Sequence, residues 1–371
     1  MGAVNIMNAV KVSGDINVVR SSLTVDHSLQ IPDMIPHLVE LFKDLFAHWS
    51  NLDESHFSVE KVSGGITNLL LKVSVKDENE NTIDVAVRLY GPNTDDIINR
   101  GRELQVIHHL SVAGFGPKLL GVFKNGMVQS FIHARTLIPS DLNKPKLAAE
   151  IAKQLNSFHQ VDVLGSKEPQ LWNDISKLFE KASTLSFDGS EKQKIYIQIS
   201  FDEVQDEITK LKELTGRLDA PVVFAHNDLL SENLMFNDDE EKLYFIDFEY
   251  ASYNYRGFDI GNHFNEYAGK DCDYTLYPTK DEQYHFFRNY LNPKDPNEVS
   301  DEDLEALFVE TSCYMLASHL YWALWALIQA KSSSIDFDFL NYFFMRYTEY
   351  KRRKNECFAL AKTCLSPSKT P

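Results

Sequence analysis

Two short apolar runs that each end at an aspartate constrain this chain most. The run Val222–Ala225 leads into Asp228, and the run Leu243–Ile246 leads into Asp247. A third apolar stretch, Asn233–Phe236, precedes the second run and is separated from it by a polar turn. Two apolar runs joined by a short polar turn are typical of a β-hairpin. We therefore expect both aspartates, and the asparagine that begins the third stretch, to meet at one end of a small sheet.

This combination suits phosphoryl transfer, which depends mainly on aiming the acceptor hydroxyl and neutralising phosphate charge. One carboxylate can accept the hydroxyl proton, while an amide oxygen and a second carboxylate can hold Mg²⁺, which prefers hard oxygen ligands. A lone aspartate is usually a helix cap or a turn residue, but the order matches the catalytic-loop and D-F-G motifs of protein kinases. Here Asn227 replaces the Arg and Glu249 replaces the Gly. We expect Asp228 to be the catalytic base, and Asn233 and Asp247 to be catalytic and metal-binding.

The same region is similar to the choline/ethanolamine kinase family. The resemblance rests on the runs HNDLLSEN and IDFEYASYNYRGFDIGNHFNEYAG, and weaker matches extend from about Val62 to Tyr350. It implies an α+β, two-lobed protein-kinase-like fold, with a small β-rich N-lobe and a larger, mostly helical C-lobe. ATP would bind in the cleft between the lobes. We expect a mobile tail over 1–28, a nucleotide-binding N-lobe over 29–132 and a catalytic, acceptor-binding C-lobe over 133–365.

Composition excludes several classes of partner. The formal net charge of −17 disfavours nucleic acid and anionic membrane surfaces. The four cysteines have no zinc-site spacing, so we expect reduced thiols in a reducing compartment. The most apolar window, Tyr314–Ala330, is too short and too polar for a membrane span and is better explained as a buried helix. With no signal pattern at the N-terminus, we predict a cytoplasmic protein and leave homodimer formation open.

The N-lobe pattern is strand, glycine-containing turn, strand, turn, strand, ending at Thr82–Tyr90. In a kinase-like lobe such a turn folds over the nucleotide phosphates, because glycine lets backbone N–H groups approach closely. Without the downstream aspartates, the pattern is better explained as an ordinary hairpin turn. The phosphate-binding residues would be Ser63, Gly64, Gly65, Thr67 and Asn68.

Arg88 lies late in the third strand between two apolar residues, where a charge needs a partner. Glu103 on the following helix is the candidate, and the pair would aim Arg88 at phosphate. The alternative is an exposed arginine at a strand end with no partner. The family resemblance gives Arg88 the same role and implies that the linker binds adenine. The linker residues are Gln129, Ser130, Phe131 and Ile132.

The acceptor site is predicted from aromatic residues in the C-terminal half. Aromatic stripes are usually core, but aromatic faces beside a carboxylate also bind cations. The resemblance assigns an amino-alcohol pocket to the positions of Tyr250, Glu266, Trp322, Trp325, Phe337 and Tyr342. We add Asp228 and Leu230 from the loop to this set of acceptor-binding residues. By the same resemblance Asp259 braces the catalytic loop. His226 is expected to orient that loop and His159 to be a packed core histidine.

The predicted function is ATP-dependent phosphorylation of ethanolamine to phosphoethanolamine, the first step of the CDP-ethanolamine route to phosphatidylethanolamine. Leu230 stands where choline kinases usually carry Gln, and the run Asn265–Gly269 looks more like the ethanolamine branch. Because the aromatic set is retained, choline or dual specificity stays open. An aminoglycoside-type phosphotransferase and a catalytically silent nucleotide-binding scaffold are the remaining alternatives.

Overall fold

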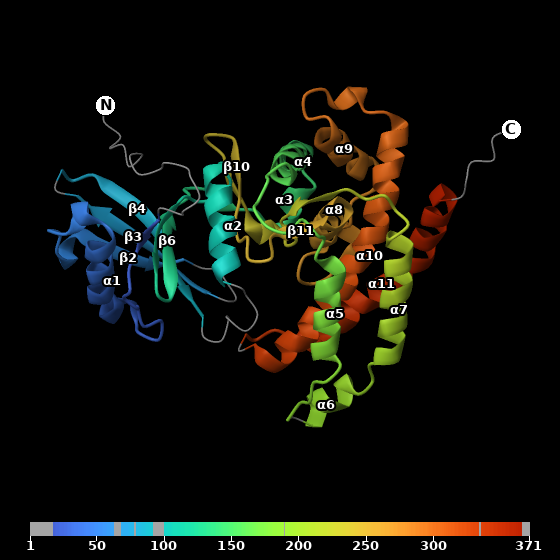
Figure 1. The fold of residues 1–371 in the computed structure, drawn as a ribbon, viewed down its shortest axis with the longest axis horizontal. Helices are drawn as coiled ribbons and strands as arrows, with labels where there is room; N and C mark the ends of the chain where they lie inside the picture. Colours follow the sequence, from blue (N-terminus) through green and yellow to red (C-terminus); the bar gives the residue numbers. More distant parts are fainter. Residues whose placement is uncertain are drawn as a thin grey trace. The chain divides into compact units, whose positions relative to one another are not determined.

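The computed structural model describes residues 18–62, 68–77, 79–91, 100–188, 190–333 and 335–365. Contacts between Cα atoms divide the chain into two compact units, Met1–His133 and Ala134–Pro371. Each unit has a hydrophobic core of its own. The first unit contains most of the strands, and the second is mainly helical (Figure 1).

The first unit is built on a six-stranded sheet with the strand order β1-β5-β6-β4-β3-β2. All neighbouring strands are antiparallel except β1 and β5, which are parallel. The strands are β1 (Val19–Arg20), β2 (Phe57–Lys61), β3 (Asn68–Lys76), β4 (Thr82–Tyr90), β5 (Leu119–Phe123) and β6 (Gly126–Ser130). The helices described in this unit are α1 (Ile31–Leu45), η1 (Ala47–Trp49), η2 (Glu54–His56) and α2 (Arg100–Val112).

Helix α1 covers one face of this sheet. Alternate residues of the central strands, such as Leu71 and Val73 on β3 and Val87 on β4, are fully buried. They pack in one cluster with Leu38 and Phe42 of α1. Successive strand residues point to opposite faces, so the period-two pattern of apolar residues selects the face that the helix covers.

The predicted mobile tail over 1–28 is wrong for its last part. Val19–Arg20 pairs with Gly121–Val122 of β5, and Val25 is fully buried in the core of the first unit. Asn125 also holds this segment, since its Nδ2 donates to the Val25 carbonyl at 2.7 Å. These anchors lie about a hundred positions away in sequence, which local patterns do not reveal. Residues 1–17 lie outside the described ranges.

The second unit contains two small sheets within a helical body. The sheets have the strand orders β10-β9-β7 and β11-β8. The strands are β7 (Arg135–Thr136), β8 (Val222–Ala225), β9 (Leu234–Asn237), β10 (Lys242–Phe245) and β11 (Ser252–Tyr255). The α-helices are α3 (Pro139–Leu142), α4 (Pro145–His159), α5 (Leu171–Ala182), α6 (Ser190–Tyr196), α7 (Phe201–Thr215), α8 (Arg256–Asn265), α9 (Lys280–Leu291), α10 (Asp301–Ser332) and α11 (Phe339–Leu365). The short 3₁₀ helices are η4 (Ser231–Asn233), η5 (Glu266–Ala268), η6 (Tyr274–Leu276) and η7 (Pro296–Glu298).

Helix α10 is the centre of the second unit and is apolar around most of its circumference, as expected of a helix enclosed by others. It packs against α5, α7, α8 and α11 (Figure 1). At Gly261 of α8 the two backbones are close, since an added Cβ would lie 2.8 Å from the Met315 backbone nitrogen. Glycine is therefore required for this helix crossing.

The reading of Tyr314–Ala330 as part of a buried helix is confirmed, because these residues lie within α10. Among the helices of the described ranges, none is long and apolar enough to cross a membrane.

Candidate active site

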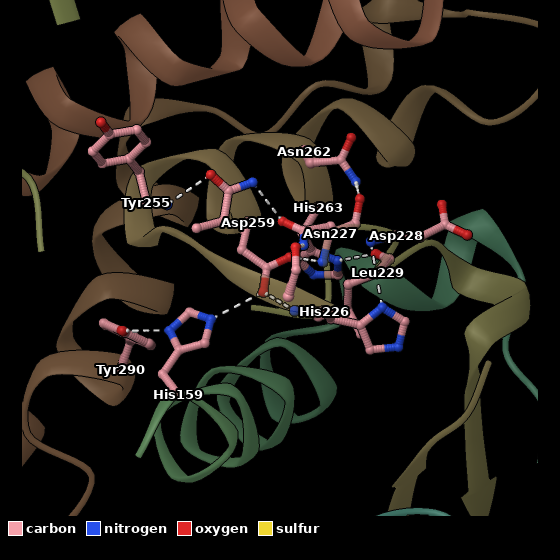
Figure 2. A network of polar contacts seen from close by, with 12 residues as sticks. His159, His226, Asn227, Asp228, Leu229, Tyr255, Asp259, Asn262, His263 and Tyr290 are labelled. Atoms are coloured by element: carbon pink, nitrogen blue, oxygen red, sulfur yellow. Dashed lines mark hydrogen bonds and ion pairs between the residues drawn. The ribbon is translucent and has the colours of Figure 1, made fainter. Parts of the chain in front are cut away.

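The loop His226–Asp228 follows β8 and is held by one buried carboxylate. Strand β8 pairs with β11, which leads directly into α8 and so carries Asp259 beneath the loop. Asp259 accepts the N–H of His226 on Oδ2 and the N–H of Asn227 on Oδ1, both at 2.7 Å. Figure 2 shows the loop backbone gathered around this carboxylate. The prediction that Asp259 braces the catalytic loop is confirmed.

A second layer supports Asp259 from helix α4. His159 Nε2 lies 3.0 Å from Asp259 Oδ2, and His159 Nδ1 lies 2.7 Å from the Tyr290 hydroxyl (Figure 2). Burial alone would raise the pKa of Asp259, but the bonds from His159 and from the loop N–H groups hold it below its ordinary value. His159 is buried and hydrogen-bonded, as predicted for a packed core histidine.

Asn227 occupies the position of the protein-kinase arginine and has a structural task. Its φ of 66° places it in the left-handed region, where Asn is among the least strained residues. Its Nδ2 donates to the Tyr250 carbonyl and to Ser252 Oγ, both at 2.9 Å, and its Oδ1 accepts from Asn254 at 2.8 Å. Two of these bonds tie the loop to the strand β11, and the third ties it to Tyr250 just before that strand. Sequence reasoning recorded Asn227 only as a departure from the kinase motif.

His226 orients the loop, as predicted. Its Nε2 lies 2.9 Å from the Ile246 carbonyl, so Nε2 carries the proton, and its Nδ1 accepts the Asp228 N–H at 3.3 Å. Burial lowers the pKa of His226. The neutral imidazole thus links the loop before Asp228 to the segment before Asp247.

Asp228 is buried and contacts the amide of Asn233. The Nδ2 of Asn233 donates to the Asp228 carbonyl at 2.8 Å and to Oδ2 of its carboxylate at 3.1 Å. Burial, followed by the nearby carboxylates of Glu266, Asp247 and Glu249, raises the pKa of Asp228 well above its ordinary value. In Figure 2 the Asp228 side chain points away from the bracing network around Asp259. A buried carboxylate with a raised pKa is suited to accept a proton near neutral pH.

The predicted hairpin is confirmed and brings the two metal-ligand candidates to one end. Strands β9 and β10 pair with Leu234 opposite Phe245, and the Ile246 N–H donates to the Asn233 carbonyl at 3.0 Å. Asp247 follows at once with a left-handed φ of 62°.

These two residues fit Mg²⁺ by their chemistry. Because Nδ2 of Asn233 faces Asp228, its Oδ1 is left without a hydrogen bond from any described residue. Amide and carboxylate oxygens are hard ligands, and Mg²⁺ in kinase sites takes only one or two protein carboxylates. Within the described ranges no group of three His, Cys, Asp or Glu side chains is placed to hold a metal. A site here would therefore need nucleotide phosphates and water to complete it.

In the first unit, the predicted pair of Arg88 and Glu103 is present. Arg88 Nη1 lies 3.5 Å from Glu103 Oε1, and both side chains are buried. The alternative of an exposed, unpaired arginine is thereby contradicted. A buried ion pair is weak evidence for a gain in stability, so we interpret this pair by its effect on the orientation of the Arg88 side chain.

The predicted phosphate turn cannot be placed, since Ser63, Gly64, Gly65 and Thr67 lie outside the described residues. Asn68 is the first residue of β3 and pairs with Tyr90 of β4.

The four predicted adenine-binding residues differ in whether their backbone N–H groups already have an acceptor in the protein. Gln129 lies inside the sheet between β5 and β4. The Ser130 N–H donates to the Lys118 carbonyl at 2.8 Å, and the Phe131 N–H to the Asp84 carbonyl at 3.4 Å. Among these four, and within the described ranges, the Ile132 N–H is the one without a protein acceptor. A hydrogen bond from the linker to adenine would therefore come from Ile132.

The predicted aromatic residues of the acceptor site form one continuous cluster in the second unit. Tyr250 and Trp322 have ring centroids 5.4 Å apart, as do Trp322 and Trp325. Phe339, which sequence reasoning did not select, joins Trp325 to Phe337, with ring centroids 5.8 and 4.9 Å away respectively. Phe337 continues to Tyr342 at 5.7 Å. Trp325 Nε1 also donates to the Tyr250 hydroxyl at 3.0 Å.

Glu266 has a partner that sequence reasoning missed. Arg346 on α11 donates from Nη1 to Glu266 Oε1 at 2.9 Å and to the Tyr342 hydroxyl at 3.1 Å. Its guanidinium is buried, and its carbon lies 5.7 Å from the Tyr342 ring centroid. The available signal was an arginine within an apolar stripe of the last helix. Leu230 is half-buried, and its N–H donates to the Asp228 carbonyl at 3.0 Å.

Comparison with known proteins agrees with this geometry. The family model described as choline/ethanolamine kinase matches residues 59–351. A probable ethanolamine kinase of Arabidopsis thaliana is 64% identical over 94% of this chain and 93% of its own. Ethanolamine kinase 1 of Mus musculus is 37% identical over 87% of this chain and 90% of its own.

Among solved structures, the ethanolamine kinase of Plasmodium vivax is 32% identical and superposes with a TM-score of 0.76, covering 88% of this chain and 92% of that one. The predicted α+β, protein-kinase-like fold is thus confirmed. The chain belongs to the choline/ethanolamine kinase family.

Proposed function

We propose that this chain transfers the γ-phosphoryl group of ATP to the hydroxyl of ethanolamine and releases phosphoethanolamine. This reaction would be the first step of the CDP-ethanolamine route to phosphatidylethanolamine. The observation that carries the proposal is the buried Asp228, held beside Asn233 on a loop whose backbone is fixed by Asp259. The chain's likeness to proteins named ethanolamine kinase supports the choice of acceptor.

Asp228 is the group proposed to receive the acceptor's proton as the hydroxyl oxygen attacks phosphorus. Its neighbours Asp247 and Glu249, together with Glu266, whose charge Arg346 partly offsets, make the site negative, which favours a cationic acceptor. The same negative charge raises the pKa of Asp228, so the base is stronger than an exposed aspartate. Arg88, oriented by Glu103, is proposed to neutralise charge on the phosphates.

Asn233 and Asp247 are the residues that would hold Mg²⁺, through the amide oxygen of the first and a carboxylate oxygen of the second. When bound, Mg²⁺ neutralises phosphate charge in this reaction class. The protein's own contribution is the hairpin end, which fixes both side chains next to the base.

The amino group of the acceptor is assigned to Glu266 and the aromatic cluster of Tyr250, Trp322, Trp325, Phe337 and Tyr342. A primary ammonium needs hydrogen-bond acceptors, and a carboxylate supplies them. Choline is the second candidate acceptor, because a trimethylammonium group binds well against aromatic faces and the aromatic cluster is continuous. We propose that the enzyme is cytoplasmic, in keeping with its four free cysteines. Homodimer formation stays a prediction.

The test is ATP consumption with ethanolamine, choline and kanamycin, each supplied alone and then in competition. We expect kcat/KM to be highest for ethanolamine, lower for choline and undetectable for kanamycin. Preference for choline would make the chain a choline kinase. Turnover of kanamycin would point to an aminoglycoside-type enzyme. Binding of ATP without turnover of any acceptor would indicate a scaffold.

A further inference from the structure

The hydroxyl of Ser318 lies at the centre of a buried polar junction in helix α10. Its oxygen accepts hydrogen bonds from Arg346 Nη2 at 2.9 Å and from Asn265 Nδ2 at 3.0 Å, and it donates one to Asn262 Oδ1 at 2.7 Å. A serine hydroxyl offers one donor and two acceptor positions, so every position is used. Because Ser318 is fully buried, water cannot take over a bond that is lost.

In one direction the junction reaches the carboxylate assigned to the acceptor's amino group. Arg346 donates from its other terminal nitrogen to Glu266 Oε1 at 2.9 Å. The guanidinium is planar and its donors are fixed relative to one another, so anchoring Nη2 on Ser318 also fixes the direction from which Nη1 meets Glu266.

In the other direction the junction reaches the catalytic loop. Asn262 accepts from Ser318 and from Trp322 Nε1, both at 2.7 Å, which leaves its Nδ2 to donate to the Asn227 carbonyl at 3.3 Å. That carbonyl belongs to the peptide bond between Asn227 and Asp228. Figure 2 shows the Asn262 amide aimed at this loop.

We propose that Ser318 is a positioning residue that fixes the separation between the two ends of the acceptor. This inference rests on the proposed function, since it takes Glu266 as the ammonium site and Asp228 as the base. Asn262 lies in the last turn of α8 and Glu266 follows directly after this helix, so the helix sets the distance between their backbones. Ser318 adds one anchor that is shared by the side-chain path to Glu266 through Arg346 and the path to the loop through Asn262.

A fixed separation predicts selection by acceptor length. Ethanolamine and 3-aminopropanol carry the same hydroxyl and ammonium groups and differ by one methylene between them. With the anchor in place, the longer acceptor cannot satisfy both ends and reacts poorly. In Ser318→Ala the two ends can move apart, so the ratio of kcat/KM for ethanolamine to that for 3-aminopropanol falls by about tenfold or more, since misplacement by roughly 1 Å costs about a hundredfold in rate. The KM for ATP stays within about twofold of the wild-type value.

The matched control is Thr311→Val. Thr311 lies seven positions earlier on α10, is equally buried, and its hydroxyl makes no hydrogen bond within the described residues. Removal of this hydroxyl is expected to leave the length ratio unchanged. Thermal melting of both variants checks that they fold. If Ser318→Ala does not fold, Ser318→Cys keeps most of the volume while weakening all three bonds, and it should move the ratio in the same direction.

The outcomes separate this inference from the function on which it rests. A lowered ratio in the Ser318 variant alone supports the positioning role. A ratio equal to wild type, or equal losses in the ATP and acceptor parameters, overturns the positioning role and leaves the function standing. A wild-type chain that phosphorylates neither amino alcohol overturns the proposed function and this inference with it.

Discussion

Asp228 shows how a single residue can trade stability for reactivity. It is buried among three other acids, and these surroundings raise its pKa. A charged carboxylate in such a place destabilises the folded state, yet the same surroundings make it a better proton acceptor. The Asn233 amide donates a side-chain hydrogen bond to this carboxylate at 3.1 Å. Two opposite effects of the same substitution follow, one on turnover and one on stability.

For turnover, Asp228→Asn keeps the shape of the side chain and removes the proposed base. We expect kcat with ethanolamine to fall on the order of a hundredfold to ten-thousandfold. The dissociation constant for ATP, measured by calorimetry, should change little. Asp239→Asn, on the exposed hairpin turn, is the control and should keep the wild-type rate. Near-normal kcat in Asp228→Asn would rule out the role of base.

For stability, the same variant should melt at a higher temperature than wild type at about pH 8. With a raised pKa in the folded state, Asp228 contributes stability below the unfolded pKa of 3.8, and this contribution is lost as pH rises through the folded value. Asn has no proton to lose, so the difference in Tm should shrink as the pH falls towards about 4. A constant or reversed difference across that range would contradict the raised pKa.

Leu230 tests the choice of acceptor at the residue scale. It is half-buried and its N–H donates a hydrogen bond to the Asp228 carbonyl, so a polar side chain here changes the surroundings of the proposed base. We expect Leu230→Gln to shift the ratio of kcat/KM towards choline over ethanolamine, by several-fold. Competition assays with both amino alcohols measure the ratio. An unchanged ratio would mean that Leu230 does not set the selectivity between the two amino alcohols, and that the aromatic cluster sets it instead.

At the scale of elements, the contact between α8 and α10 positions Asp259 and Asn262, which support the loop before Asp228. Gly257 and Gly261 let the helices meet, and Asn262, one residue further along α8, then reaches Ser318. The same contact keeps Asp259 beneath the catalytic loop. The site is therefore a product of helix packing as much as of the loop itself.

Gly261→Ala probes this contact. The new Cβ would lie 2.8 Å from the Met315 backbone nitrogen, and a backbone atom cannot turn aside as a side chain can. We expect a loss of about 1–3 kcal/mol in the free energy of unfolding, as for other overpacked sites. Denaturant melts provide the measurement, with Ser157→Ala on the exposed side of α4 as a control. Unchanged stability would mean that the helices separate without cost.

Prediction from sequence succeeded where the signal was local. The hairpin that joins Asn233 to Asp247 is encoded by two apolar runs and a polar turn within fifteen residues, and the Arg88–Glu103 pair also spans fifteen positions. Arg346 escaped because its partner Glu266 is 80 positions away, and an arginine within an apolar stripe of α11 does not by itself identify that partner. Ser318 and Asn262, 56 positions apart, escaped for the same reason.

At the scale of the whole molecule, the acidic surface bears on encounters with membranes. The net charge is −17, and each side chain of the compact basic run Lys351–Lys354 is paired with a glutamate on α7 or α11. Within the described ranges, this run therefore offers no unpaired basic patch, although the protein is proposed to supply a lipid pathway.

We expect no adsorption to vesicles rich in phosphatidylserine at physiological salt, because anionic lipids attract unpaired lysines and arginines and repel a negative surface. Co-sedimentation with such vesicles, and with neutral phosphatidylcholine vesicles as a reference, measures this. Salt-sensitive binding to the anionic vesicles alone would show that a basic surface is exposed after all.

The left-handed backbone at Asn227 and Asp247 has a consequence for mutagenesis of this site. Both positions tolerate chiefly Gly, Asn and Asp on conformational grounds alone. A saturation library at either codon would therefore be depleted of most variants before any chemistry is tested. The variants that stay folded would be those whose residue tolerates a left-handed backbone. Asp247→Asn is the exchange that removes the carboxylate charge while keeping a residue suited to this backbone.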